Sequence, residues 1–214
     1  MDNRLSSLYR LGGLTGILSG VLMLASTIWF LIVSDASIVS DLSQADLGRI
    51  GIFHGIGVVT LILLVPTLLA SYGLLSSATH TRSALGASLA ALWIAIELIA
   101  HCSQTAPINA LSELMTGEGA NTEIGETFYA LWREWGEALF MTGAFLCVLL
   151  ALCYGSALYA WGNPVAAYLF FLSIVAFPGG LVLGLDVQLH VIIRGIAFLF
   201  LGGVLIQAPD GEDI

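Results

Sequence analysis

Long apolar runs dominate this chain and constrain its fold more than any other feature. Each run reaches or approaches the roughly 20 residues that an α-helix needs to cross about 30 Å of hydrocarbon. Within lipid, a spanning segment must satisfy its own backbone hydrogen bonds, which favours helices. The sequence therefore predicts an all-α polytopic membrane protein, a single domain of six transmembrane helices in one bundle. The predicted spans cover residues 11–33, 50–76, 83–106, 129–157, 164–184 and 187–207 of the 214-residue chain.

Composition and charge narrow the expected partners. The chain is 58% hydrophobic and 10% charged, with a formal net charge of −9, six arginines and no lysine. Such a chain offers no basic surface to neutralise phosphates, so no nucleic acid is expected as a partner. The expected partner is the lipid bilayer. Small residues allow helices to approach closely, and glycines recur within the spans, as at Gly12, Gly16 and Gly20. A homo-oligomer is therefore also a candidate.

The short loops set the expected orientation. Arg4, Arg10 and Arg82 fall in the N-terminal segment and the second loop, whereas the loops on the other side are acidic. Because cytoplasmic loops carry an excess of arginine and lysine, we expect an integral protein of the cell membrane with both termini cytoplasmic. Residues 107–128 are expected to form an acidic outer loop. Apolar residues at helical spacing in its first part indicate a short segment that lies on the membrane surface as a lid.

Two spans share an unusual pairing of an acid with a histidine four residues later. Glu97 precedes His101 in one span, and Asp186 precedes His190 at the start of another. This spacing places acid and imidazole on one helix face, one turn apart. Ionisable groups at bilayer depth are costly and rare, so each pair is a candidate for a functional site.

The alternating direction of the spans brings these groups to a similar depth. At 1.5 Å per residue, His54 and Arg194 lie within about 12 Å of the outer ends of their helices, and Glu97 lies at about 15 Å. The inner halves of the spans contain few ionisable residues. We therefore predict one polar cavity open to the outside. Arg194 is its expected counter-charge, and further residues for charge balance or substrate binding are Asp186, Arg133, Glu134, Trp93 and Gln104.

A metal site is one hypothesis for this cavity. His54, His101, His190 and Glu97 are ligand types that suit Zn²⁺ or iron, and a catalytic tetrahedral site needs three protein ligands and a water molecule. Glu137 or Glu134 would then serve as the general base that activates the bound water. A haem held between two histidines is another hypothesis, with Gly51, Gly55 and Gly57 beside His54 making room for the macrocycle.

A third hypothesis needs no cofactor. Burial favours the neutral form of a carboxyl group, so Glu97 is a candidate proton donor, and His101 one turn away is a candidate acceptor or relay. With Glu137, these residues form the expected catalytic set. The substrate would be a lipophilic or small membrane-borne molecule. The leading interpretation is thus a membrane-embedded enzyme, metal-assisted or driven by carboxylate and histidine.

A non-catalytic role is the competing class. Arg194 and Arg133 need counter-charges, which Glu97, Glu134 and Glu137 can supply, and such buried networks hold helices in register. The protein would then be an accessory subunit, a sensor or a transporter.

The chain also resembles a family of small six-helix membrane proteins of bacteria and archaea whose function is unknown. The resemblance lies in Arg10-Leu-Gly-Gly-Leu-Thr-Gly, which leads into the first span, Gly162-Asn-Pro before the fifth, and Arg194-Gly-Ile-Ala-Phe in the sixth. It covers nearly the whole chain and implies a six-helix fold, with no activity and no site residues.

Overall fold

Helices account for nearly all of the described chain. The computed structural model describes residues 3–33, 44–116, 121–184 and 188–208. Six helices in these ranges are long and apolar enough to cross a membrane, and they form one bundle, which confirms the predicted fold class. The helices are α1 (Asn3–Val33), α2 (Gln44–Leu75), α3 (His80–Thr105), α4 (Ile108–Thr116), α5 (Thr122–Ala160), α6 (Pro164–Val182) and α7 (Gln188–Gln207).

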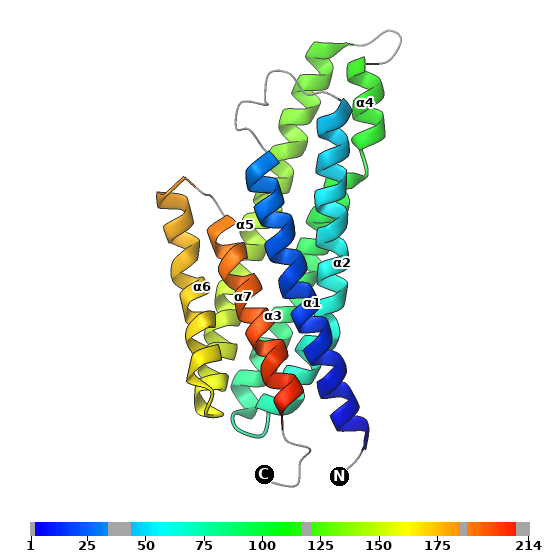
Figure 1. Cartoon of the computed structure of the whole chain (residues 1–214). Helices are drawn as coiled ribbons and strands as arrows, with labels where there is room; N and C mark the ends of the chain where they lie inside the picture. The colour runs from blue at the N-terminus through cyan, green and yellow to red at the C-terminus, as the bar shows by residue number, and fades with distance from the viewer. Residues whose placement is uncertain (1–2, 34–43, 117–120, 185–187, 209–214) are drawn as a thin grey trace.

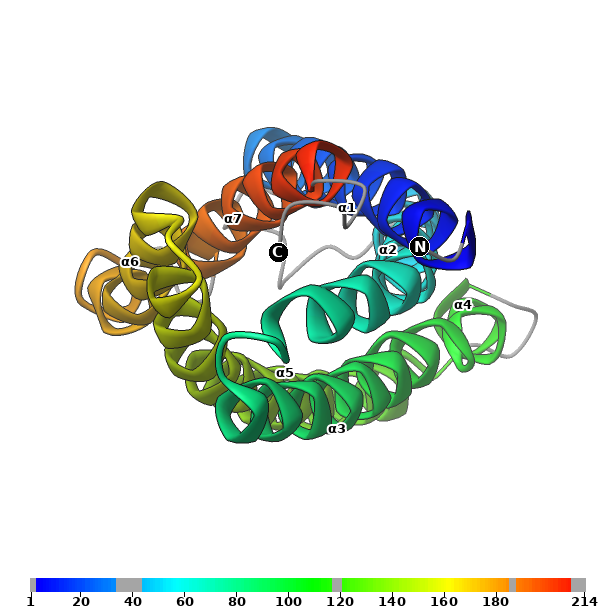
Figure 2. The same ribbon diagram turned by 90° about the horizontal axis from the view of Figure 1, so that it is seen from below.

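The six long helices form a closed ring, seen along its axis in Figure 2. Neighbours around the ring are α1, α2, α3, α5, α6 and α7, and α7 packs back against α1. Successive helices run in opposite directions, so α1 begins and α7 ends at the same end of the bundle (Figure 1). That this end is cytoplasmic remains a prediction. Since α3 and α7 are not neighbours, only side chains can join them across the centre.

Glycines of α1 allow the ring to close. A Cβ atom at Gly13 would lie 2.8 Å from the carbonyl oxygen of Gly202 in α7, and one at Gly20 would lie 2.6 Å from that of Gly195. A Cβ atom at Gly16 would lie 2.9 Å from Thr67 in α2 and 3.2 Å from Gly202 in α7. The predicted close contacts thus form inside one chain. They therefore provide no surface for the homo-oligomer that these glycines suggested.

The turn between α5 and α6 explains the Gly162-Asn163-Pro164 motif. Gly162 has a φ of +96°, in the left-handed region that glycine adopts without a steric penalty. The side chain of Asn163 accepts a hydrogen bond from the backbone N–H of Ala166, and Pro164 occupies the first turn of α6, where no N–H is needed. The motif therefore ends one helix and starts the next within three residues.

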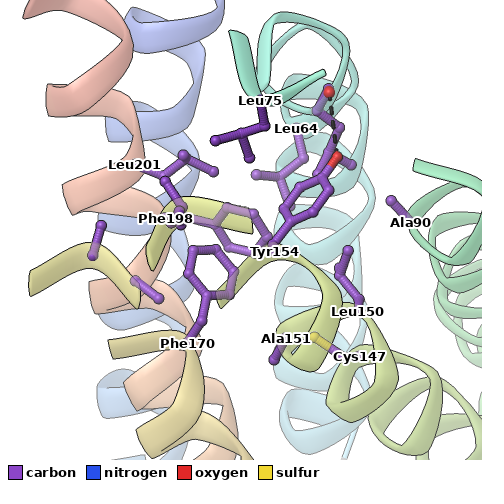
Figure 3. Close-up of a cluster of buried hydrophobic side chains, with 14 of the residues drawn as sticks. Leu64, Leu75, Ala90, Cys147, Leu150, Ala151, Tyr154, Phe170, Phe198 and Leu201 are labelled. Carbon is purple, nitrogen blue, oxygen red and sulfur yellow. Dashed lines mark hydrogen bonds between the residues drawn. The ribbon is translucent and has the colours of Figure 1, made fainter. Parts of the chain in front are cut away.

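A cluster of buried aromatic and aliphatic side chains from α2, α5, α6 and α7 forms the core of the bundle (Figure 3). Phe170 of α6 contacts Tyr154 of α5 and Phe198 of α7 edge-on, at ring centroid distances of 6.2 and 5.7 Å. The hydroxyl of Tyr154 donates a hydrogen bond to the backbone oxygen of Leu68 in α2, at 3.4 Å. Side chains of α5, α6 and α7 thus meet in one apolar core, which Tyr154 also joins to α2.

The segment expected as an acidic outer loop is largely helical. Residues 108–116 form α4, and α5 begins at Thr122 after an N-cap by Asn121. Leu111 of α4 is buried against Trp132 of α5, which explains why the apolar spacing produces a packed helix. In Figure 1, α4 stands beside the start of α5 and does not lie across the bundle as a surface lid would.

The length of α5 requires part of it to leave the bilayer. Its 39 residues extend for about 58 Å at 1.5 Å per residue, and the hydrocarbon core is only about 30 Å thick. Figure 1 shows the start of α5 projecting with α4 beyond the ends of α1, α6 and α7. We refer to α4 and this start of α5 as the α4–α5 projection. The first half of α5 carries exposed charged side chains, among them Glu126, Arg133 and Glu137.

Candidate functional site

Polar side chains buried in the ring form two groups. The histidine pair consists of His54 on α2 and His101 on α3, and the arginine cluster consists of Glu97 and Trp93 on α3 with His190 and Arg194 on α7. All six side chains are buried, with exposed fractions between 0 and 9%. Whether this region opens to the outside, as the predicted cavity would, remains a prediction.

The two imidazoles of the histidine pair are in direct hydrogen-bond contact. Nδ1 of His54 lies 2.9 Å from Nδ1 of His101. Phe140 of α5 stacks on the ring of His54 at 5.7 Å and meets the ring of His101 edge-on at 4.9 Å. A Cβ atom at Gly57 would overlap the ring of His101, so this glycine provides the space in which the ring lies.

The contact makes the two rings chemically different. One imidazole must donate with Nδ1–H, and when it is neutral its Nε2 is unprotonated; the other accepts with Nδ1, and its Nε2 carries the proton. The neutral pair therefore offers one basic and one acidic nitrogen. Burial among aromatic rings strengthens such a hydrogen bond, because the local dielectric constant is low.

Arg194 and Glu97 form the centre of the arginine cluster. Nη1 of Arg194 donates to Oε1 of Glu97 at 2.9 Å, and Nη2 donates to Oε2 at 3.5 Å. The guanidinium carbon lies 4.8 Å from the ring centroid of Trp93, a cation–π distance. Since both carboxylate oxygens accept from the guanidinium, Glu97 serves as its counter-ion. This geometry does not support the predicted role of Glu97 as a proton donor.

Helix spacing explains how the cluster is built. Trp93 and Glu97 are one turn apart on α3, and Arg194 and Phe198 are one turn apart on α7. The rings of Trp93 and Phe198 stack at 5.9 Å with planes 6° apart. The two helices are thus joined twice across the centre, once by charge and once by aromatic stacking.

His190 is held in one tautomer by α6. Its Nδ1 lies 2.8 Å from the backbone oxygen of Ser173, and because a carbonyl can only accept, Nδ1 carries the proton. The ring of Phe177 meets it edge-on at 5.7 Å. Nε2 of a neutral His190 is therefore an acceptor, and it is buried without a hydrogen-bond partner among the described residues.

The structure does not assemble the predicted metal ligands. Within the described ranges, no group of three or more His, Cys, Asp or Glu side chains could hold a metal ion. His54 meets His101, but Glu97 is bound to Arg194 and His190 to the backbone of α6. The haem hypothesis meets a similar obstacle, because the two imidazoles touch and the space at Gly57 is filled by the ring of His101.

Several predicted residues lie away from the buried groups. Arg133 bonds to Glu137 at 2.6 Å on an exposed face of α5, with side chains 52% and 57% exposed, and Glu134 is exposed as well. Glu137 thus faces the surface of α5 and pairs with Arg133, which does not favour its predicted role as a general base beside Glu97. Gln104 is buried and donates to the backbone oxygen of Trp132. Asp186 lies outside the described residues.

Glycines of the helices that face α3 provide space for its buried polar side chains, a relationship that the sequence did not predict. A Cβ atom at Gly143 would lie 2.8 Å from Cγ of Glu97, and one at Gly136 would overlap the side chain of Gln104. With Gly57 against His101, each of these three buried polar side chains lies over a glycine of a neighbouring helix. Spacing on one helix cannot reveal this, because it depends on how the helices face each other.

Comparisons of the chain with protein-family models, with curated proteins and with solved structures give no significant match. The resemblance to six-helix membrane proteins therefore stays a prediction, and function has to be inferred from the geometry.

Proposed function

We propose that this protein is a membrane-embedded enzyme that acts on a lipophilic substrate by acid–base chemistry, with the histidine pair as its proton relay. The observation that carries this proposal is the 2.9 Å contact between Nδ1 of His54 and Nδ1 of His101. Histidine exchanges protons near neutral pH more readily than any other side chain, which makes two directly bonded imidazoles a suitable relay.

The relay moves one proton without creating net charge on the pair. The basic Nε2 takes a proton from the substrate, and the proton on Nδ1 of the same ring crosses to Nδ1 of the other ring. That second ring releases its Nε2 proton to another atom of the substrate or to water. One proton enters and one leaves, so both rings end neutral with their tautomers exchanged. In a medium of low dielectric constant this avoids the cost of a buried charge.

The arginine cluster supports this role by remaining neutral overall. Arg194 and Glu97 balance each other one helical turn from His101, so they place no net charge beside the relay. The aromatic side chains Trp93, Phe140 and Phe198 give the surroundings an apolar character suited to a substrate that is dissolved in lipid.

A non-catalytic accessory or sensor role is the second candidate. It is favoured by the double connection between α3 and α7, since an ion pair and an aromatic stack are sufficient reason to bury these residues. Transport is less well supported. Polar side chains of α1 and α2 bind the neighbouring helix instead of lining a path: Thr15 bonds to Thr67, and Ser19 donates to the backbone of Thr60.

The test uses the full chain in lipid nanodiscs, with the total lipid extract of the membranes from which it is purified. The reaction is run in D₂O, and lipids that gain deuterium or change in amount are identified by mass spectrometry. We expect at least one lipid to change with the wild type and not with His54→Gln or His101→Gln. His80→Gln, at the exposed start of α3, is the matched control. If no lipid changes, or if the pair variants act like the wild type, the accessory role is preferred.

A further inference from the structure

Three buried polar atoms in the arginine cluster have no hydrogen-bond partner among the described residues. They are Nε1 of Trp93, Nε of Arg194 and Nε2 of His190. Native proteins pair most of their buried polar atoms, so each exception requires an explanation, and an unseen bound molecule is one. Three exceptions in one cluster point to a shared cause.

Two of the three side chains are in contact, and the third lies one helical turn along α7 from Arg194. The guanidinium of Arg194 lies over the ring of Trp93, and His190 precedes Arg194 by one turn of α7. Each side chain is held by other contacts: Trp93 by stacking on Phe198, Arg194 by Glu97, and His190 by the backbone of Ser173. None of them needs the unpartnered atom to keep its position, so that atom is left for a ligand.

The chemistry of the three atoms selects a hydroxyl group. Trp93 and Arg194 each present an N–H donor, and His190 in the tautomer set by Ser173 presents an acceptor. A hydroxyl group has one donor and two acceptor lone pairs, which matches this set atom for atom. A carbonyl group cannot donate to His190. A carboxylate has the same defect and would also add an unbalanced charge, because Glu97 already neutralises Arg194.

We infer that the arginine cluster binds the hydroxyl group of a neutral lipophilic alcohol. The body of the ligand is apolar, since aromatic side chains surround the cluster and lipid surrounds the bundle. This inference deepens the proposed function by naming the head group of its substrate, and it rests on that function. A buried water molecule shares the hydroxyl chemistry, so the experiment must separate the two.

The first experiment compares competitors on the wild-type chain in nanodiscs. A hexadecanol that carries a photoreactive diazirine is the probe, and labelled peptides are mapped by mass spectrometry. We expect labelling on α3 and α7. Hexadecan-1-ol should compete about tenfold better than hexadecyl methyl ether, whose oxygen accepts but cannot donate to His190, and better still than hexadecane. Equal competition by the three compounds, or labelling elsewhere, would mean that water alone occupies the cluster and would overturn the inference.

The second experiment removes single partners. Trp93→Phe keeps an aromatic ring but loses its N–H, and His190→Leu loses the acceptor; each should weaken alcohol labelling about tenfold. Trp135→Phe and His80→Leu, at exposed positions, are the matched controls and should label normally. Labelling that is unchanged in both cluster variants contradicts the inference. If a variant fails to fold, the competition experiment on the wild type still shows whether the cluster binds the alcohol.

Variants of the histidine pair distinguish the proposed relay from the proposed alcohol site. His54→Gln and His101→Gln should abolish lipid turnover and retain alcohol labelling, because the pair does not contribute the three atoms. Turnover without hydroxyl-dependent labelling would leave the relay intact and refute the alcohol site. Hydroxyl-dependent labelling without turnover would support the alcohol site and refute the relay.

Discussion

Arg194 and Glu97 join two helices that are not neighbours in the ring. Nη1 of Arg194 on α7 donates to Oε1 of Glu97 on α3 at 2.9 Å, and each side chain is only 6% exposed. Trp93 and Phe198 repeat the connection one turn away. Because water cannot reach either charge freely, the loss of one partner leaves the other unbalanced in an apolar medium.

Glu97→Gln should therefore destabilise the protein strongly. Removal of one partner of a buried ion pair costs about 3–5 kcal/mol, whereas replacement of both by apolar residues is often neutral. Glu97→Leu combined with Arg194→Met should thus recover most of the loss. Glu137→Gln, in the exposed pair with Arg133, is the control and should cost about 1 kcal/mol or less. Denaturant unfolding in mixed micelles measures all three variants. A cost at Glu97 no larger than at Glu137 would contradict the buried pair.

Gly57→Ala should break the histidine pair. The new methyl group would overlap the ring of His101, which would have to move away from His54. Gly55→Ala is the matched control, since no atom outside its own helix lies within 4 Å of a Cβ atom there. NMR of ¹⁵N-histidine-labelled protein should detect a coupling across the Nδ1–H···Nδ1 bond in the wild type and in Gly55→Ala. The coupling should be absent from Gly57→Ala, and its persistence there would contradict the observed geometry.

Two adjacent glycines of α7 should respond in opposite ways. A Cβ atom at Gly202 would lie 2.6 Å from the carbonyl oxygen of Gly13, so Gly202→Ala forces α1 and α7 apart and should cost about 1–3 kcal/mol. At Gly203 no such neighbour lies within 4 Å, and alanine favours the helix there by up to about 1 kcal/mol. Thermal unfolding of the two variants in one detergent gives the comparison. Equal stability would indicate that the ring is not closed by this contact.

Leu111→Ala should release α4 from the start of α5. Leu111 is 1% exposed and packs against Trp132, and truncation of a buried leucine costs about 2–5 kcal/mol. Because α4 is only nine residues long, we expect local unfolding of the α4–α5 projection, seen as faster amide hydrogen exchange over residues 108–116. Exchange in the other helices should not change. Leu131→Ala, at a 64% exposed position of α5, should leave α4 protected.

The sequence by itself determined the class of the protein and the number of its spans. Six apolar runs of sufficient length leave few alternatives to six helices, because an unsatisfied backbone is too costly in lipid. Spacing on single helices also determined which side chains share a face. Glu97 lies one turn from His101 and from Trp93, and Arg194 lies one turn from His190, whatever the helices pack against.

Only the tertiary structure decided which of these faces meet. It paired His54 with His101, Glu97 with Arg194 and His190 with the backbone of Ser173, where the sequence had suggested one shared set of ligands. It also placed Glu137 on an exposed face of α5, outside the buried groups. The physical reason lies in the solvent. Lipid accepts apolar side chains on every face of a helix, so hydrophobicity does not set the rotation of each helix. That rotation follows from close contacts such as Gly13 with Gly202, which exist only once the helices are packed.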